Sequence, residues 1–425
     1  MHIAFFNRSY YPDQTATGQL LTELCEELVR EHGCQVSVIT GRPLHPVAGA
    51  DRPDRSLVAR DAQHGVRIFR ARGTRFSKSR FAGRACNYLT YFLSACYAGL
   101  RLDAPDVVVA LTDPPIVGLA AWLARLRFGA PLVMVFQDVF PEVTIILRDF
   151  QSPAINSALR RVNRFLVRRA ARNVAIGETM RQRLIEDKGA PPDRTVVIAN
   201  WADTSAIQPG PRDNAWSRAF HLTGKFVVMH SGNLGLAQNL ETLVDAAALL
   251  REVPDVQVVL QGDGVKKPAL LERVKTLNLT NVTFLPFAPK DALGDSFAAA
   301  DLFVIGLERG LAGYIVPSKV YGILAAGRPF IAAVEPTCEV ASMATEHDCG
   351  VVVEPGDARA LADGILACYR DRERTARLGA NARTISHQFD RARQAARYAD
   401  LFRELAHTEP VGASARGEEA HVGRG

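Results

Sequence analysis

Short apolar runs alternate with longer segments of helical periodicity along almost the whole chain. Many of these runs are nearly continuous Val, Ile and Leu, which is typical of parallel strands buried on both faces. Before residue 200, strands are predicted at His2–Phe6, Gln35–Thr40, Val66–Ala71, Val107–Thr112, Leu132–Gln137, Asn173–Ile176 and Thr195–Ala199. After it, strands are predicted at Phe226–His230, Val256–Gln261, Val282–Pro286, Leu302–Gly306, Phe330–Val334 and Val351–Val353.

The segments between the strands place apolar residues at helical spacing, as in Val117–Arg127, Leu240–Arg251 and Ala360–Tyr369. Strands that alternate with crossover helices predict a parallel sheet covered by helices on both faces. Because 425 residues are too many for one ordinary hydrophobic core, two doubly wound α/β domains are expected. A stretch rich in Pro, Gly and Asp follows residue 200 and indicates the domain boundary. The N-terminal domain is therefore expected to span residues 1–200, and the C-terminal domain residues 201–390.

The chain twice shows a strand, a glycine-containing loop and an amphipathic helix in succession. The first loop ends in Thr17 and Gly18, and the second begins with Ser231, Gly232 and Asn233. Small residues let backbone N–H groups approach a phosphate, and the dipole of the following helix adds positive potential. Both units are therefore candidate nucleotide-binding elements.

In the second domain, polar or glycine-rich loops follow consecutive predicted strands, and a further loop leads into a predicted helix at Ser318 and Lys319. Ligands of open parallel sheets bind at the carboxyl ends of the strands. Each loop alone is more typical of a turn or a helix cap, but their order favours a nucleotide-diphosphate site. The candidate donor-binding residues are Gly18, Ser231, Gly232, Asn233, Gly262, Asp263, Gly264, Lys266, Ser318 and Lys319.

Composition and missing motifs narrow the function. The sequence contains neither GxxxxGK[ST] nor a GxGxxG loop followed by the acidic residue of a dinucleotide site. The seven cysteines are scattered without a CxxC pair, which favours a reducing compartment and no metal site. No apolar run reaches the ~18 residues of a membrane span. The excess of 51 Lys and Arg over 45 Asp and Glu is compatible with phosphate-bearing or anionic-membrane partners, and no nucleic-acid partner is expected.

Four segments, SGNLGLAQNLETLVDAA, LQGDGVKK, VPSKVYGILAAGRPFIA and NWADTSAIQP, resemble the retaining nucleotide-sugar glycosyltransferases of family 4. The similarity extends over residues 1–405, and the nearest branch resembles bacterial capsule, O-antigen and exopolysaccharide enzymes, including fucosamine-type amino-sugar transferases. The resemblance implies a GT-B fold of two facing Rossmann-like domains, with the donor in the C-terminal one and the acceptor in the N-terminal one. It also implies a C-terminal helix, residues 391–407, that packs back on the N-terminal domain. Residues 408–425 lack a hydrophobic pattern and are expected to be disordered.

The expected reaction transfers a sugar from a nucleotide diphosphate to a lipid-linked saccharide. The resemblance implies retention at the transferred carbon, a UDP-linked N-acetylated amino sugar as donor, and no metal or other cofactor. Two alternatives remain open, a nucleotide-sugar epimerase of the same architecture and a non-catalytic sugar-nucleotide-binding scaffold. The enzyme is expected in the cytoplasm, at the inner face of the cell membrane.

The sequence departs from the family pattern at the donor site. The family often has two glutamates eight residues apart, and aligning the LAAG segment places Tyr314 and Gly322 at these positions. The second glutamate usually binds the ribose, so ribose recognition must come from elsewhere, with Glu308 and Glu335 as weak candidates. The usual Arg and Lys are also replaced, which leaves Lys266, Lys319 and Arg328 to offset the diphosphate charge.

Strand ends of the N-terminal domain carry candidate acceptor and catalytic residues. Asp113 ends one predicted strand, and Asp138 and Glu142 follow another. Asp138 is expected to project into the cleft, where related enzymes often place a His or Asp near the sugar; its alternative is a helix N-cap. Glu142 is a second catalytic candidate, or else a charge in the first turn of a helix. Thr17 and Asp113 are expected on the acceptor side.

Two stretches indicate a membrane surface. Arg75–Leu102 has basic residues ahead of an apolar, aromatic helix, and Ala154–Arg172 interleaves arginines with apolar side chains. A basic face beside an apolar one suits an anionic membrane. The alternative is that the apolar residues belong to the core.

Overall fold

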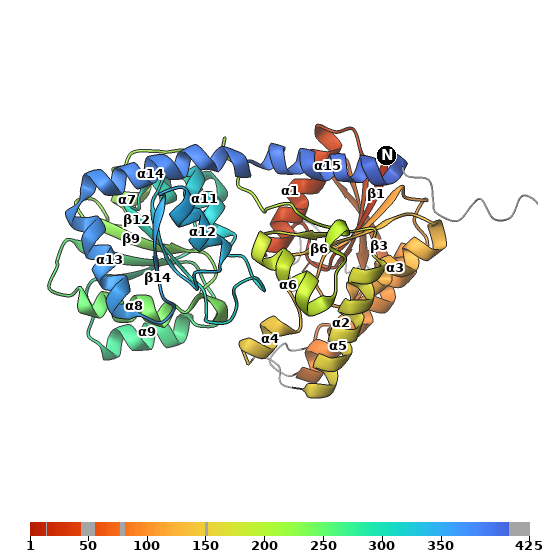
Figure 1. Ribbon diagram of the computed structural model, residues 1–425, viewed down its shortest axis with the longest axis horizontal. Helices are drawn as coiled ribbons and strands as arrows, with labels where there is room; N and C mark the ends of the chain where they lie inside the picture. Colours follow the sequence, from red (N-terminus) through yellow and green to blue (C-terminus); the bar gives the residue numbers. More distant parts are fainter. Residues whose placement is uncertain (14, 44–55, 77–80, 149–151, 408–425) are drawn as a thin grey trace, which may run out of the picture.

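Two sheets form in the chain, one on each side of residue 200, and each carries helices on both faces (Figure 1). The computed structural model describes residues 1–13, 15–43, 56–76, 81–148 and 152–407. The predicted tail, residues 408–425, and the basic residues Lys78 and Arg80 lie outside the described residues.

The N-terminal sheet has the strand order β3-β4-β2-β1-β5-β6-β7-β8. Its strands are β1 (His2–Phe6), β2 (Gln35–Gly41), β3 (Val58–Gln63), β4 (Val66–Ala71), β5 (Val107–Ala110), β6 (Leu132–Phe136), β7 (Arg172–Ala175) and β8 (Thr195–Val197). The helices of this lobe are α1 (Ala16–Arg30), α2 (Phe81–Gly99), α3 (Val117–Phe128), α4 (Glu142–Ile146), α5 (Pro153–Arg169) and α6 (Glu178–Lys188).

The C-terminal sheet is parallel throughout, in the order β11-β10-β9-β12-β13-β14. Its strands are β9 (Phe226–Ser231), β10 (Val256–Gln261), β11 (Val282–Leu285), β12 (Leu302–Gly306), β13 (Phe330–Ala333) and β14 (Gly350–Val353). The remaining helices are α7 (Ala215–Ala219), α8 (Leu240–Leu249), α9 (Lys267–Thr276), α10 (Leu293–Ala298), α11 (Lys319–Ala325), α12 (Glu339–Glu346), α13 (Ala358–Arg370), α14 (Arg372–Ser386) and α15 (Arg391–His407).

The structure confirms the predicted fold class of two doubly wound α/β units. Each predicted strand is present, with ends that differ by one or two residues. The sequence pattern missed β3, which pairs antiparallel with β4 at the edge of the N-terminal sheet. Arg60 and Asp61 are exposed on this strand, so it lacks the apolar run that identified the buried strands.

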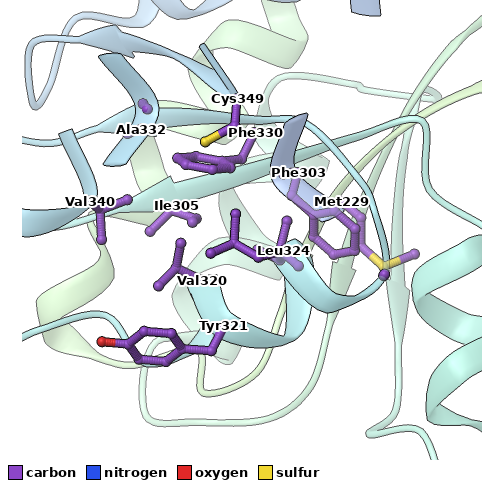
Figure 2. Packing of buried hydrophobic residues seen from close by; sticks show 14 of the residues in the cluster. Met229, Phe303, Ile305, Val320, Tyr321, Leu324, Phe330, Ala332, Val340 and Cys349 are labelled. Atoms are coloured by element: carbon purple, nitrogen blue, oxygen red, sulfur yellow. The ribbon is translucent and has the colours of Figure 1, made fainter. Parts of the chain in front are cut away.

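Helix α11 is anchored in the core of the C-terminal lobe. Val320, Tyr321 and Leu324 are buried and pack in one cluster with Ile305 of β12 and Phe330 of β13 (Figure 2). Fully buried aromatic and branched side chains hold their positions closely because protein interiors are tightly packed. The start of α11, which carries Lys319, is therefore fixed relative to the sheet.

The C-terminal helix α15 crosses from the C-terminal lobe to the N-terminal lobe, along the top of Figure 1. Phe402 is completely buried there, and its ring lies 6.0 Å from the ring of Phe5 in β1. Tyr398 packs on the same cluster, 6.3 Å from the ring of Trp201 in the connection between the lobes. The end of the described chain thus belongs to the hydrophobic core of the first lobe.

Candidate active site

The glycine loops after β9 and β10 lie against each other at the carboxyl edge of the C-terminal sheet. Gly232 and Gly262 have φ of +128° and +134°, which side chains disfavour. A Cβ atom on Gly262 would lie 1.9 Å from the Gly232 carbonyl oxygen, so the contact requires glycine. The loops that the sequence placed on consecutive strand ends therefore meet in space.

The loop after β10 supports the loop after β9. Leu234 donates its N–H to the Asp263 carbonyl oxygen at 2.9 Å, and the Lys266 N–H donates to the Leu234 carbonyl oxygen at 3.0 Å. A Cβ atom on Gly264 would lie 2.4 Å from that Leu234 oxygen. The Asp263 carboxylate accepts the N–H of Gly264 at 2.8 Å, so Asp263 stabilises its own turn.

Polar groups at the end of β9 border the loop that follows it. The Ser231 hydroxyl accepts a long hydrogen bond of 3.5 Å from the Gln261 amide. Asn233 is exposed, and its carbonyl oxygen lies 3.5 Å from Nε2 of His230. Ser231, Gly232 and Asn233 thus surround the end of β9 as predicted, but their contact with a donor stays a prediction.

Lys319 lies beside this loop at the start of α11. Its Nζ atom is 3.7 Å from the position of a Cβ on Gly232 and 3.0 Å from Nε2 of His230. Burial lowers the pKa of the Lys319 ammonium to about 7. Ser318 is the N-cap residue of α11, but its side chain makes no capping hydrogen bond. The structure thus brings a cation to the edge where both glycine loops meet.

Two other predicted cations are already engaged elsewhere. Lys266 forms an ion pair with Glu241 at 2.5 Å, which compensates its charge. Arg328 donates to the carbonyl oxygens of Gly210 and Ala298, both at 2.7 Å, and so ties the connection between the lobes to α10. Lys319, by contrast, forms no ion pair with any of the described residues. Lys319 is therefore the predicted cation whose charge remains available at this edge.

Both positions where the family often has glutamates serve other purposes. A Cβ atom on Gly322 would lie 2.8 Å from the Phe297 ring, so the packing leaves no room for a side chain there. The Tyr314 hydroxyl donates to Asp187 of α6 at 2.7 Å, across the two lobes. Glu335, a candidate ribose ligand, accepts the Gly310 N–H at 2.8 Å. The ribose contact therefore stays unassigned.

A cavity of about 510 Å³ opens in the N-terminal lobe, between α2, α5 and the ends of β1, β5 and β6. Thr17, Asp113 and Asp138 line it, as do apolar side chains that include Leu89 and Leu159. Three predicted acceptor-side or catalytic residues thus share one space. One part of the lining is polar, with Asp113 and Asp138 beside Arg8 and Arg84, and another part is apolar.

Asp113 is held by two residues of the loop that follows β1. The Ser9 hydroxyl donates to its carboxylate at 2.7 Å, and Arg8 pairs with it at 3.3 Å. The Arg8 guanidinium also lies 5.0 Å from the ring centre of Tyr88. The sequence analysis missed Arg8 and Ser9, although the three polar residues after a buried strand, Asn7, Arg8 and Ser9, are a usable signal.

Asp138 stands where the two lobes touch. Its backbone pairs with Ile315 in an isolated bridge, and the Val139 N–H donates to the Tyr314 carbonyl oxygen at 2.9 Å. The N-cap residue of α4 is Pro141, so the structure does not support the helix-cap interpretation of Asp138. Burial, and secondarily the charge of Asp113, raises the pKa of the Asp138 carboxyl to about 6.

Two predicted site residues have structural contacts instead. Glu142 accepts hydrogen bonds from Lys188 and from Arg160, and it does not line the cavity. Its catalytic role stays a prediction. Gly18 belongs to the first turn of α1 in the N-terminal lobe, where its N–H donates to the Thr15 hydroxyl at 3.3 Å. Its predicted donor contact likewise stays a prediction.

The described part of the chain contains no candidate metal site. There, no three His, Cys, Asp or Glu side chains gather in a way that could hold a metal ion. All seven cysteines are free, and five of them are buried.

Comparison with known proteins agrees with this architecture. Residues 15–201 match the family model of the glycosyl transferase 4-like domain, and residues 213–385 match that of the glycosyl transferases group 1. The chain is 31% identical over 296 residues to the probable glycosyltransferase WbjE of Pseudomonas aeruginosa, covering 68% of this chain and 72% of that protein. The chain therefore belongs to the glycosyltransferases built from a 4-like and a group 1 domain.

Further similarities extend over most of the chain. It is 24% identical over 375 residues to the putative colanic acid biosynthesis glycosyl transferase WcaI of Escherichia coli, covering 86% of this chain and 91% of that protein. The crystal structure of Anabaena HepE with UDP and glucose matches with a TM-score of 0.72 and 20% identity, over 95% of this chain and all of that one. The likeness to such solved glycosyltransferases shows the GT-B fold.

The first prediction concerns Lys319. Replacing Lys319 with Ala removes the available cation, so nucleoside-diphosphate binding should weaken by about 1.5–3 kcal/mol, the range of a charge-assisted hydrogen bond. Titration calorimetry with UDP and GDP at pH 6.5 measures the change. Lys266→Ala is the matched control and should have a smaller effect, because Glu241 already pairs with Lys266. Equal affinities of wild type and Lys319→Ala would remove Lys319 from the site.

The second prediction concerns Asp138. If its carboxylate orients the reacting groups, Asp138→Asn should lower turnover roughly 100-fold and leave nucleotide affinity unchanged. Since Asp138 is protonated below its pKa of about 6, wild-type turnover at saturating donor should fall as the pH drops through 6. The Asn variant should not show this fall. A lowered melting temperature with normal turnover would instead assign Asp138 a structural role.

Proposed function

We propose that this protein transfers a sugar from a nucleotide-diphosphate donor to a lipid-linked saccharide during cell-surface polysaccharide synthesis. The observation that carries the proposal is the edge of the C-terminal sheet, where two glycine loops and Lys319 meet. The contact between the lobes brings Asp138 to the boundary with the C-terminal lobe. WbjE and WcaI, whose names state glycosyl transfer, support this class of reaction.

The donor is proposed to bind the C-terminal lobe through its diphosphate. The Lys319 ammonium, which lies beside the glycine loop after β9, suits a phosphate at this edge. HepE was crystallised with UDP and glucose, which supports a UDP-sugar as the donor class. From the family resemblance, an N-acetylated amino sugar is the proposed sugar.

The chemistry is proposed to proceed with retention and without a metal. As the bond to the sugar breaks, negative charge develops on the diphosphate. Lys319 is proposed to stabilise this charge, and such a preorganised group is worth most where water is excluded. Asp138 is proposed to orient the transferred sugar or the acceptor hydroxyl from the other lobe.

The acceptor is proposed to occupy the cavity of the N-terminal lobe. Its polar wall suits a saccharide, and its apolar wall, formed partly by Leu89 of α2 and Leu159 of α5, suits a lipid. Leu89, Leu93 and Tyr97 recur every four residues on α2, and they are 52%, 58% and 40% exposed. An apolar stripe therefore leads away from the cavity along the outer face of the helix.

The same region carries the basic surface expected at a membrane. Arg161, Arg164 and Arg168 of α5 are exposed. None of the described helices is sufficiently long and apolar to cross a membrane. We expect α2 and α5 to rest on the anionic inner face of the membrane, where a lipid-linked acceptor is available.

A donor and acceptor panel tests the proposal. The full chain is incubated with UDP- and GDP-linked sugars, with and without a polyprenyl-diphosphate saccharide, and in the presence of EDTA. Sugar transfer to the lipid that persists in EDTA is expected. Conversion of the donor without acceptor would indicate an epimerase. Nucleotide binding with no turnover of any pair would indicate a scaffold, and both results would contradict the proposal.

Membrane binding provides a separate prediction. Each Arg near an anionic surface contributes about 1 kcal/mol, so changing Arg161, Arg164 and Arg168 to Gln should weaken binding to anionic vesicles by about 3 kcal/mol at low salt. Co-sedimentation measures the partition. Part of the binding should resist salt and be lost in Leu93→Ser.

The control removes three exposed arginines from the C-terminal lobe, Arg251, Arg359 and Arg377, and should bind vesicles as the wild type does. Equal sedimentation of the wild type with neutral and anionic vesicles, or none with either, would exclude this surface.

A further inference from the structure

His230 is a completely buried imidazole at the end of β9, between Lys319 and the neighbouring strand β12. Its Nε2 atom lies 3.0 Å from Nζ of Lys319, and its Nδ1 atom lies 3.3 Å from the carbonyl oxygen of Val304. An ammonium group only donates hydrogen bonds, so Nε2 must accept. Nδ1 then carries the proton and donates to Val304. One neutral tautomer therefore satisfies these two shorter contacts, while the Asn233 carbonyl oxygen lies 3.5 Å from Nε2, at the limit of hydrogen-bond distance.

A neutral hydrogen-bond partner leaves the positive charge of a lysine available, whereas an acidic partner neutralises it. Glu241 neutralises Lys266, so the pair presents little net charge to a phosphate. The imidazole of His230 fixes Lys319 through a hydrogen bond but adds no negative charge. An imidazole also has one rigid direction of acceptance, which holds the ammonium beside the Gly232 loop.

We propose that His230 is a positioning residue for the donor, whose neutral imidazole holds Lys319 against the glycine loop and leaves its positive charge to the diphosphate. This inference rests on the proposed donor site. It adds a residue that neither the sequence motifs nor the family positions single out. The signal in the sequence is a histidine that ends an apolar strand directly before Ser231.

The arrangement couples donor binding to a proton. Within the described residues, the Lys319 ammonium lies next to His230 of β9 and the Gly232 loop, and neither of them is acidic. Burial, together with the Lys319 charge, lowers the pKa of His230 well below its usual range, so the imidazole stays neutral. Since the pKa of Lys319 in the empty site is about 7, Lys319 is mostly neutral at pH 8.5. A bound diphosphate raises this pKa, so binding at pH 8.5 takes up a proton and is weaker than at pH 6.5.

Three variants of His230 separate position from charge. His230→Leu removes the hydrogen-bond acceptor of Lys319, His230→Gln replaces it with an uncharged acceptor, and His230→Glu replaces it with a charged one. We expect the Leu variant to bind UDP, GDP and pyrophosphate about tenfold more weakly, from the loss of one hydrogen bond to a charged group. The Gln variant should recover most of this affinity. The Glu variant should bind more weakly than the Gln variant and should no longer take up a proton.

Titration calorimetry at pH 6.5 and 8.5, in buffers of different ionisation enthalpy, measures affinity and proton uptake together. In the Leu variant the donor KM should rise and kcat should fall, because Lys319 is also proposed to stabilise the charge that develops on the leaving diphosphate. His2→Gln is the matched control, because His2 is a buried histidine of the other lobe and contacts Ser37 at 2.9 Å. It should leave nucleotide binding unchanged.

The outcomes distinguish a failure of the proposed donor site from a failure of the proposed role of His230. A wild type that binds neither nucleoside diphosphates nor pyrophosphate overturns the donor site and the role of His230 with it. Loss of binding in Lys319→Ala but not in a folded His230→Leu overturns the role of His230 alone. If the Leu variant does not fold, equal affinity and equal proton uptake of the Gln and Glu variants overturn it.

Discussion

A half-buried positive charge without an acidic partner is the constraint around which the C-terminal lobe is arranged. Removing an ammonium from water is costly unless another charge replaces the lost solvation. The packing of Val320, Tyr321 and Leu324 fixes the start of α11, and His230 fixes the lysine itself. The Gly232 loop lies directly beside Lys319. The cost of holding Lys319 is thus offset when an anionic ligand binds, which is typical of a functional site.

The departure from the family pattern and the placement of Asp138 are linked. Tyr314 occupies the position of a family glutamate, and it joins the lobes through Asp187 and through the N–H of Val139, the residue after Asp138. A second contact lies at α12, where the buried Glu339 accepts the Met180 N–H at the start of α6 at 3.0 Å. A carboxylate suits the positive end of a helix dipole. The segment that supplies a ligand in related enzymes therefore serves here to set the relative position of the lobes.

The sequence predicted what depends on local patterns and failed where tertiary contacts decide. Continuous apolar runs identified the buried strands, and strand order along the chain placed the glycine loops at one edge. Sequence periodicity does not reveal which basic side chains form ion pairs. Lys266 and Lys319 were therefore equivalent candidates in the sequence, whereas in the structure Glu241 pairs with Lys266 and not with Lys319. Glu142 follows a strand end, and the sequence does not reveal that Lys188 contacts it from α6, 46 residues further along the chain. His230 escaped notice because its partners lie on two other elements.

The two lobes contribute charges of opposite sign that stay apart. Burial shifts the pKa of Asp138 upward and that of Lys319 downward, so each group is held nearer to its neutral form. A direct ion pair would remove both shifts, and no such pair links these two residues in the described structure. In the proposed complex, a sugar bound between the diphosphate and the acceptor would separate the two charges, because the diphosphate would pair with Lys319 and hydroxyl groups could donate to Asp138.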